Sequence, residues 1–148
     1  MESLISVCVL VFKNEDILFV RSNSQRGKLK LVLPGGNLMD NQTIEDCAIK
    51  EVKDSTGLDI KLESKLNGVI MRRNKKGNSL ITFVLLAEAL SPIKSNNAVF
   101  ISHKVVSHYR EISDFSKLVV EKVKASNLSS LDKHEFEDSD NKKYLLYF

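Results

Sequence analysis

Two acidic residues three positions apart, Glu51 and Asp54, are the strongest candidates for chemistry in this sequence. On a helix they project from the same side of adjacent turns, so their carboxylates could converge on one cation. Carboxylate oxygens are ligands that hard divalent ions such as magnesium prefer. Lys50 could instead pair with Asp54 across one turn, a surface contact that contributes little stability. The helix alone leaves both interpretations open.

The helix that must carry these acids is predicted over residues 44 to about 56. Thr43 can serve as its N-cap, acidic residues follow in the first turn, and Gly57 is placed to end it in a left-handed conformation. With about 100° of rotation per residue, Glu51 falls on the margin of the apolar flank that contains Val52. An ionised carboxylate there is costly unless it is paired, hydrogen-bonded or bound to a metal.

A glycine-containing loop precedes this helix. The short apolar segment 31–33 is stopped by Pro34-Gly35-Gly36, because proline and paired glycines end strands. From Gly36 to Leu58 the chain resembles the Nudix hydrolase family without a gap. The family pattern is a Gly, five residues, a Glu, seven residues, Arg-Glu, an aliphatic residue, one residue, Glu-Glu, one residue, a Gly and an aliphatic residue. The positions that match it are Gly36, Glu51, Val52, Gly57 and Leu58.

Four positions depart from the family pattern. Lys50 replaces the Arg and Asp54 replaces the first Glu of the pair, which keeps the charge but forfeits the planar fork by which an Arg orients a carboxylate. Gln42 and Ser55 replace the other two Glu residues and lose a charge outright. The resemblance therefore predicts a site with fewer carboxylates than the family pattern provides.

A further acid is also missing from its expected place. In many members of the family, a loop before the late strand contributes an additional carboxylate to the metal cluster or serves as base. Here residues 89–110 contain no Asp or Glu, and only Glu88 and Glu111 flank that stretch. Neither flanking residue is a strong candidate for this role.

The resemblance implies an α+β fold, in which a mixed sheet is sandwiched between helices (α/β/α). It also implies a cofactor, Mg²⁺ or Mn²⁺, held by Glu51 and Asp54 together with the substrate's diphosphate. Because magnesium is often held by only one or two carboxylates plus phosphates, two acids can suffice. Glu51 and Lys50 are the implied catalytic residues, with Lys50 orienting Glu51.

Three residues are candidates for contacting the substrate, a nucleotide or another small molecule that contains a diphosphate. Gly35 and Gly36 would let the loop backbone approach the phosphates. Arg21, at the end of an apolar segment, could donate charge-assisted hydrogen bonds to phosphate oxygens, although an ordinary solvated charge is an equally good interpretation.

The implied activity is hydrolysis of the pyrophosphate linkage of a nucleoside diphosphate derivative by metal-activated water. The lost charges at Gln42 and Ser55 predict reduced activity, because fewer acids bind the ion less tightly. The alternative is a non-catalytic nucleotide-binding or regulatory module on the same fold.

The whole chain, residues 1–148, is predicted to form a single domain, since a chain of this length buries a core without disulfides or a structural metal. Hydrophobic patterning predicts hairpins from segments 4–12 and 17–20 and from segments 58–73 and 80–90, a short strand at 98–102, and a second helix that begins at Ser113-Asp114. A polar tail from about residue 126 to residue 143 is predicted to be irregular. The apolar segment 144–148 could dock on the sheet or seal a dimer, so an oligomer is possible.

Composition narrows the class of protein. The chain is 43% hydrophobic and 28% charged, as in soluble globular domains, and its net charge of +3 gives little support for a nucleic-acid partner. Cys8 and Cys47 fit neither a disulfide framework nor a zinc site and are predicted to be buried thiols. No apolar run reaches membrane-spanning length, and no signal peptide is recognisable at the N-terminus, so we expect a cytoplasmic protein without a membrane partner.

Overall fold

The computed structural model describes residues 3–23, 29–73, 76–125, 133–139 and 143–147. Nine strands and two α-helices lie in these ranges, with a short 3₁₀ turn at Val106–His108. The elements, in chain order, are β1 (Ser3–Lys13), β2 (Asp16–Asn23), β3 (Leu29–Val32), β4 (Gly35–Asn37), α1 (Ile44–Thr56), β5 (Ile60–Arg73), β6 (Ser79–Ala89), β7 (Ala98–Ser102), α2 (Asp114–Ala125), β8 (Lys133–Glu137) and β9 (Lys143–Tyr147).

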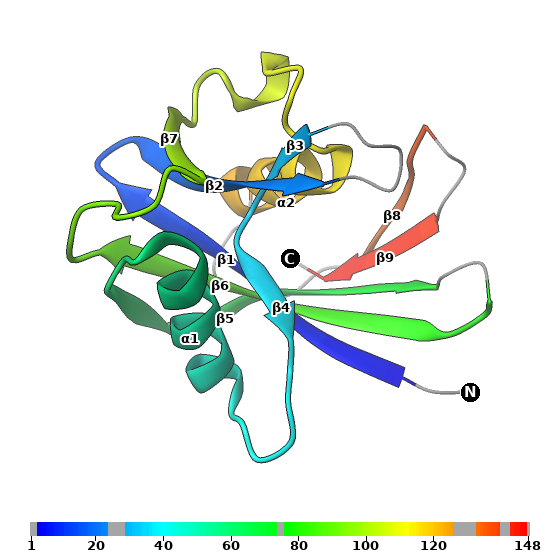
Figure 1. Ribbon diagram of the computed structural model, residues 1–148. Helices are drawn as coiled ribbons and strands as arrows, with labels where there is room; N and C mark the ends of the chain where they lie inside the picture. Colours follow the sequence, from blue (N-terminus) through cyan, green and yellow to red (C-terminus); the bar gives the residue numbers. More distant parts are fainter. Residues whose placement is uncertain (1–2, 24–28, 74–75, 126–132, 140–142, 148) are drawn as a thin grey trace.

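The strands form one mixed sheet in the order β3-β2-β1-β6-β5-β9-β8, with β4 paired to β1 and β7 paired to β2 (Figure 1). β1 and β6 run parallel, and the other strand pairs that the structure describes are antiparallel. The two hairpins predicted from the sequence are confirmed as β1–β2 and β5–β6, as is the short strand β7.

The helices cover opposite faces of this sheet, as the predicted α/β/α arrangement requires. Val7 and Val9 of β1 pack with the buried side chains of α1, whereas Cys8 and Leu10 pack with those of α2. Because successive side chains on a strand point to opposite faces, one apolar strand can supply both cores. The continuous apolar run of β1 is explained by this burial on both sides.

The predicted helix 44–56 is confirmed, and its ends are fixed by local chemistry. The Thr43 hydroxyl accepts a hydrogen bond from the Asp46 backbone N–H, and the Asp46 carboxylate accepts one from the Thr43 N–H, which completes a capping box. Gly57 ends the helix with φ 76°, and its N–H donates to the Lys53 carbonyl. These caps determine where α1 begins and ends, and therefore how it presents Glu51.

The prediction of an irregular tail is wrong for residues 133–137. This segment forms β8, which pairs with β9, and β9 pairs in turn with Val69 to Arg72 of β5. Of the two alternatives for the apolar C-terminal segment, the structure shows docking on the sheet, as β9. The predicted irregular stretches 126–132 and 140–142 lie outside the described residues. Among the residues that are described, no helix is both long and apolar enough to cross a membrane.

Two glycines with positive φ provide a test of the α1 cap. Gly57 has φ +76° and Gly77 has φ +80°, so an alanine at either position would incur the left-handed backbone cost of about 1–2 kcal/mol. At Gly57 the added Cβ would also lie 2.7 Å from the Lys94 Cβ, while at Gly77 it would meet nothing within 4 Å. We expect Gly57→Ala to lower the free energy of unfolding in urea by more than Gly77→Ala does. An equal loss in the two variants would contradict this account of the cap.

Candidate active site

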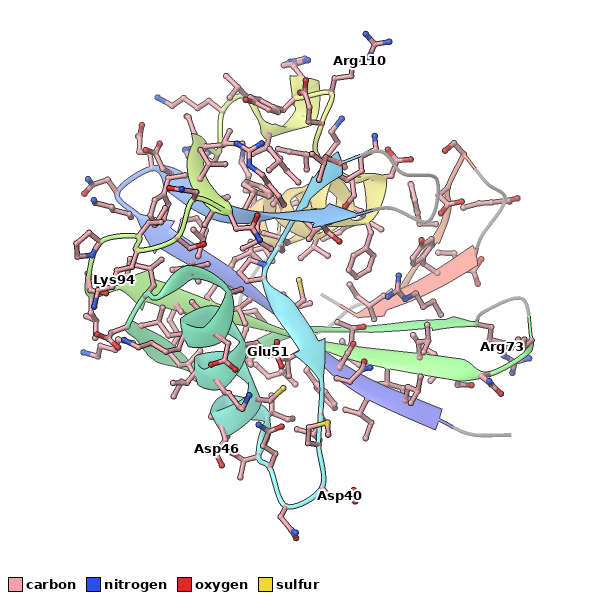
Figure 2. All side chains as sticks on the ribbon, viewed as in Figure 1. Asp40, Asp46, Glu51, Arg73, Lys94 and Arg110 are labelled. Carbon is pink, nitrogen blue, oxygen red and sulfur yellow. The ribbon has the colours of Figure 1, made fainter. Side chains whose placement is uncertain are left out.

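The carboxylate of Glu51 rests directly on the backbone of Gly36. A Cβ placed on Gly36 would lie 2.5 Å from Glu51 Cδ and 2.8 Å from each of its carboxylate oxygens. Figure 2 shows Glu51 on the side of α1 that faces β4. A side chain at position 36 would therefore occupy the space that the carboxylate fills, which explains in packing terms why a glycine stands there.

Gly35 has a different steric requirement. Its Cβ would lie 2.1 Å from the carbonyl oxygen of Val7, because Gly35 and Gly36 pair with Cys8 and Val7 in the β4–β1 ladder. The sequence predicted that these glycines end the preceding strand. In the structure they belong to a further strand, β4. That they also let a substrate's phosphates approach remains a prediction.

Glu51 is half-buried and forms no ion pair with any residue that the structure describes. Its neighbour one turn earlier, Cys47, is fully buried, and the Cys47 Sγ lies 3.6 Å from the Asn37 carbonyl oxygen. Burial raises the pKa of the Cys47 thiol, and the negative charge of Glu51 raises it further. The thiol therefore stays neutral, and the Glu51 carboxylate lies beside the glycines of β4.

Lys50 pairs with Asp54 rather than with Glu51. The Lys50 Nζ donates to Asp54 Oδ2 over 2.6 Å, and the two side chains are 60% and 59% exposed. The hydrogen bond that Lys50 donates to Asp54 raises the pKa of Lys50. This surface pair is the alternative that the spacing had left open. The predicted orientation of Glu51 by Lys50 is not present as a hydrogen bond between described residues.

The two positions that lost a charge make structural hydrogen bonds. The Ser55 hydroxyl donates to the carbonyl oxygen of Glu51 at 2.7 Å, one turn back in α1. Gln42 Oε1 accepts from the Met39 N–H at 3.0 Å and so closes the loop between β4 and α1. Ser55 therefore points along the helix, and Gln42 braces the loop that leads into it.

The remaining candidates lie away from Glu51. Arg21 is exposed on β2, where its backbone N–H donates to the Asn97 carbonyl at 2.8 Å, and no ion pair joins its side chain to the described part of α1 or β4. Glu88 is exposed near the end of β6, opposite Lys61 of β5. The carbonyl of Glu111 accepts a hydrogen bond from Leu31 of β3. Among the acids considered for the site, Glu51 and Asp54 are therefore the two that lie on the same element, α1.

The described residues contain no group of three or more His, Cys, Asp or Glu side chains arranged to hold a metal ion. What they offer is a pair of carboxylates on successive turns, one half-buried at β4 and one exposed in an ion pair with a lysine. Carboxylates are hard oxygen donors, so the donor type fits a hard divalent cation. For both acids to bind one ion, however, the Asp54 carboxylate must break its ion pair with Lys50 or keep it while also contacting the ion.

Comparison with known proteins identifies the family. The model of the NUDIX domain matches residues 3–110, so the chain belongs to the Nudix hydrolase family. Proteins of this family generally use divalent metal ions. The matched range contains β1 to β7 and the whole loop-helix unit that carries Glu51, and it ends before α2 and the β8–β9 hairpin.

Solved structures share the fold at low sequence identity. A NUDIX hydrolase from Nitrosomonas europaea has a TM-score of 0.73 and 17% identity, and the match covers 84% of this chain and 90% of that one. A MutT NUDIX hydrolase from Burkholderia pseudomallei has a TM-score of 0.69, 14% identity, and coverage of 83% and 99%. An ADP-ribose pyrophosphatase from Streptococcus suis has a TM-score of 0.57, 20% identity, and coverage of 82% and 87%.

The contact between Gly36 and Glu51 generates a direct test. In Gly36→Ala the new Cβ meets only the end of a flexible side chain, so we expect the fold to survive and the Glu51 carboxylate to be displaced. In Gly35→Ala the new Cβ meets the backbone of β1, so we expect a loss of stability of several kcal/mol. Thermal unfolding and nucleotide hydrolysis should therefore separate the two variants. Wild-type hydrolysis by a folded Gly36→Ala protein would contradict the role of this contact.

Proposed function

We propose that this chain is a divalent-metal-dependent pyrophosphohydrolase that cleaves the diphosphate linkage of a nucleoside diphosphate derivative. The observation that carries the proposal is the half-buried Glu51 carboxylate, which contacts Gly36 and forms no ion pair with the residues that the structure describes. It lies inside a loop-helix unit with family spacing. An ionised carboxylate in that position costs free energy unless a ligand compensates it. A metal ion bound together with a diphosphate supplies that compensation.

Glu51 and Asp54 would hold the metal, Mg²⁺ or Mn²⁺. Two carboxylates suit an ion that retains several waters and completes its shell with substrate phosphates. When bound, the ion lowers the pKa of a coordinated water and stabilises charge on the phosphoryl oxygens. In the overall reaction, water oxygen bonds to phosphorus, the bridging P–O bond breaks, and the two phosphate-bearing halves separate.

Other residues of this chain would act on the substrate by position and charge. Gly35 and Gly36 present no side chain, so the β4 backbone could approach phosphate oxygens closely. Once Asp54 binds a metal ion, the ammonium of Lys50 would be free to orient Glu51 or to contact a phosphate. Arg21 could contact a phosphate oxygen only if the substrate extends toward β2.

Reduced activity is part of this proposal. Gln42 and Ser55 carry no charge and are engaged in hydrogen bonds that hold the loop and the helix. The ion is therefore bound by fewer acids than the family pattern provides, and tight binding should require the substrate's own phosphates. The two unpaired buried cysteines, Cys8 and Cys47, suit a reducing compartment, so we assign the reaction to the cytoplasm.

A non-catalytic nucleotide-binding module is the second candidate function. The observation that favours it is the ion pair between Lys50 and Asp54. Because Lys50 neutralises Asp54, Glu51 is the one predicted metal ligand that has no ion pair among the described residues. Saturable binding of a nucleoside diphosphate derivative with no turnover in Mg²⁺ or Mn²⁺ would support this candidate over the enzyme.

Removing the charge of Glu51 tests the enzyme. We expect Glu51→Gln to lower kcat by about 100-fold or more, the size of the loss when one electrostatic stabiliser is removed from an active site. Hydrolysis of ADP-ribose, UDP-glucose and nucleoside triphosphates should be measured with Mg²⁺ and with Mn²⁺. Glu45→Gln, at an exposed acid of the same helix, is the matched control and should leave kcat unchanged. Unchanged turnover in Glu51→Gln would remove the site assignment.

Restoring the missing acid tests the cause of the reduced activity. We expect Ser55→Glu to raise kcat/KM by about tenfold, equivalent to about 1.4 kcal/mol, and to lower the Mg²⁺ concentration for half-maximal activity. Ser55→Ala, which breaks the same hydrogen bond to Glu51 without adding charge, should produce neither effect. If both variants behave alike, the charge at position 55 does not limit the reaction.

A further inference from the structure

Two lysines of α1 each form an ion pair with an acid. The Lys50 Nζ donates to Asp54 Oδ2 over 2.6 Å, and the Lys53 Nζ donates to Asp59 Oδ1 over 2.7 Å. All four side chains are exposed, so each pair contributes little to stability. Asp59 belongs to no candidate site, whereas Asp54 is one of the two acids proposed to bind the metal. The pair with Lys50 therefore occupies a carboxylate that the proposed reaction uses.

The ammonium of Lys50 also lies close to the half-buried acid of the site. The bond to Asp54 makes the largest contribution to the raised pKa of Lys50, and the negative charge of Glu51 raises it further. Burial and Glu51 raise the pKa of the Cys47 thiol, while Lys50 partly opposes them. The Cys47 Sγ lies 3.9 Å from the Gly36 carbonyl oxygen. Lys50 is therefore near enough to the contact between Gly36 and Glu51 for its charge to act there.

Lys50 competes with a metal ion for Asp54. A cation bound by the same carboxylate would stand beside the ammonium, and like charges at close range repel each other. The described residues contain no group of three or more His, Cys, Asp or Glu side chains that would offset this repulsion. A metal ion without a phosphate ligand should consequently bind weakly.

A diphosphate removes this competition, because it supplies negative charge for both cations. Its oxygens complete the shell of a divalent ion, and they also accept charge-assisted hydrogen bonds from an ammonium. A lysine suits such an exchange, since its ammonium is a compact charge with three donors on a flexible four-carbon stem. Asp54, once released by Lys50, regains a cationic partner in the metal.

We propose that Lys50 couples the binding of metal to the binding of diphosphate by exchanging partners. Before binding, Lys50 holds Asp54; in the complex, Asp54 binds the ion and Lys50 binds a phosphate oxygen. The inference rests on the proposed function, and it assigns Lys50 to the phosphate instead of to the orientation of Glu51. By linkage, diphosphate tightens the binding of metal by the same factor by which metal tightens the binding of diphosphate. Lys50 sets part of this coupling factor.

Binding of Mn²⁺ to the full-length protein tests the exchange. Free Mn²⁺ can be counted by electron paramagnetic resonance, with and without adenosine 5′-(α,β-methylene)diphosphate, whose bridging carbon prevents hydrolysis. Mn²⁺ bound by this analogue in solution is measured separately. In Lys50→Met, we expect Mn²⁺ alone to bind about 2- to 5-fold more tightly, because the competitor for Asp54 is gone. We expect the analogue to bind the Mn²⁺-loaded variant about tenfold more weakly, because a charge-assisted hydrogen bond is lost.

The coupling factor should therefore fall by about tenfold or more in Lys50→Met. Lys53→Met is the matched control, because it removes the same charge from the same helix and breaks the other ion pair. Its coupling factor should stay within about twofold of wild type, since exposed charges are screened by salt. Lys50→Arg keeps a cation that can pair with a carboxylate or a phosphate, so it should retain most of the coupling. An equal fall in Lys50→Met and Lys53→Met would reduce the effect to net charge and overturn the exchange.

Two other results would decide against the exchange. If Lys50→Met binds Mn²⁺ alone no more tightly than wild type, Lys50 does not withhold Asp54 from the metal. That result is also expected if Asp54 contacts the ion while it keeps its bond to Lys50. If Lys50→Met keeps the wild-type coupling factor, Lys50 does not contact the phosphate.

Failure of the exchange and failure of the proposed function give different results. The proposed site predicts that Glu51→Gln and Asp54→Asn weaken the binding of Mn²⁺ in the presence of the analogue. If both variants bind Mn²⁺ as wild type does, or if wild type binds none, the metal site is wrong and the exchange falls with it. If both weaken binding while Lys50→Met has no effect, the metal site stands and the exchange alone is overturned.

Discussion

The contact between the Glu51 carboxylate and the bare backbone of Gly36 is the constraint on which the candidate site depends. Three independent features must agree for it to exist: the pairing of β4 with β1, the start of α1 at its capping box, and the absence of a side chain at position 36. The carboxylate is half-buried without an ion pair among the described residues. The position of this carboxylate therefore follows from strand pairing, helix capping and the missing side chain together.

Around this contact, the residues that depart from the family pattern make internal bonds. The Ser55 hydroxyl is hydrogen-bonded to the backbone of α1, Gln42 closes the preceding loop, and Asp54 neutralises Lys50 at the surface. Each bond stabilises the unit locally, whereas a cluster of four carboxylates would repel itself in the absence of metal. On the proposed function, the site would rest without an ion and would acquire one together with a phosphate-bearing ligand.

Most of the fold could be predicted because its signals are local. The ends of α1 follow from Thr43 and Gly57, and the Lys50–Asp54 pair follows from four-residue spacing alone. β8 was missed because its one described apolar residue, Phe136, stands between two glutamates, so the strand exists only through its pairing with β9. The seat of Glu51 on Gly36 could not be predicted either, since it joins residues brought together by strand pairing.

The parallel pairing of β1 with β6 has a consequence for how the molecule is made. Facing residues on these strands are 76 positions apart, as between Ser6 and Thr82. During synthesis the apolar β1 must leave the ribosome long before β6 exists, and non-local pairing of this kind is slow to form. β4 takes β1 as its partner as well, over a much shorter separation in the chain. A nascent chain halted before residue 79 would hold β1, the entire glycine loop and the helix, yet lack β6, the parallel partner of β1.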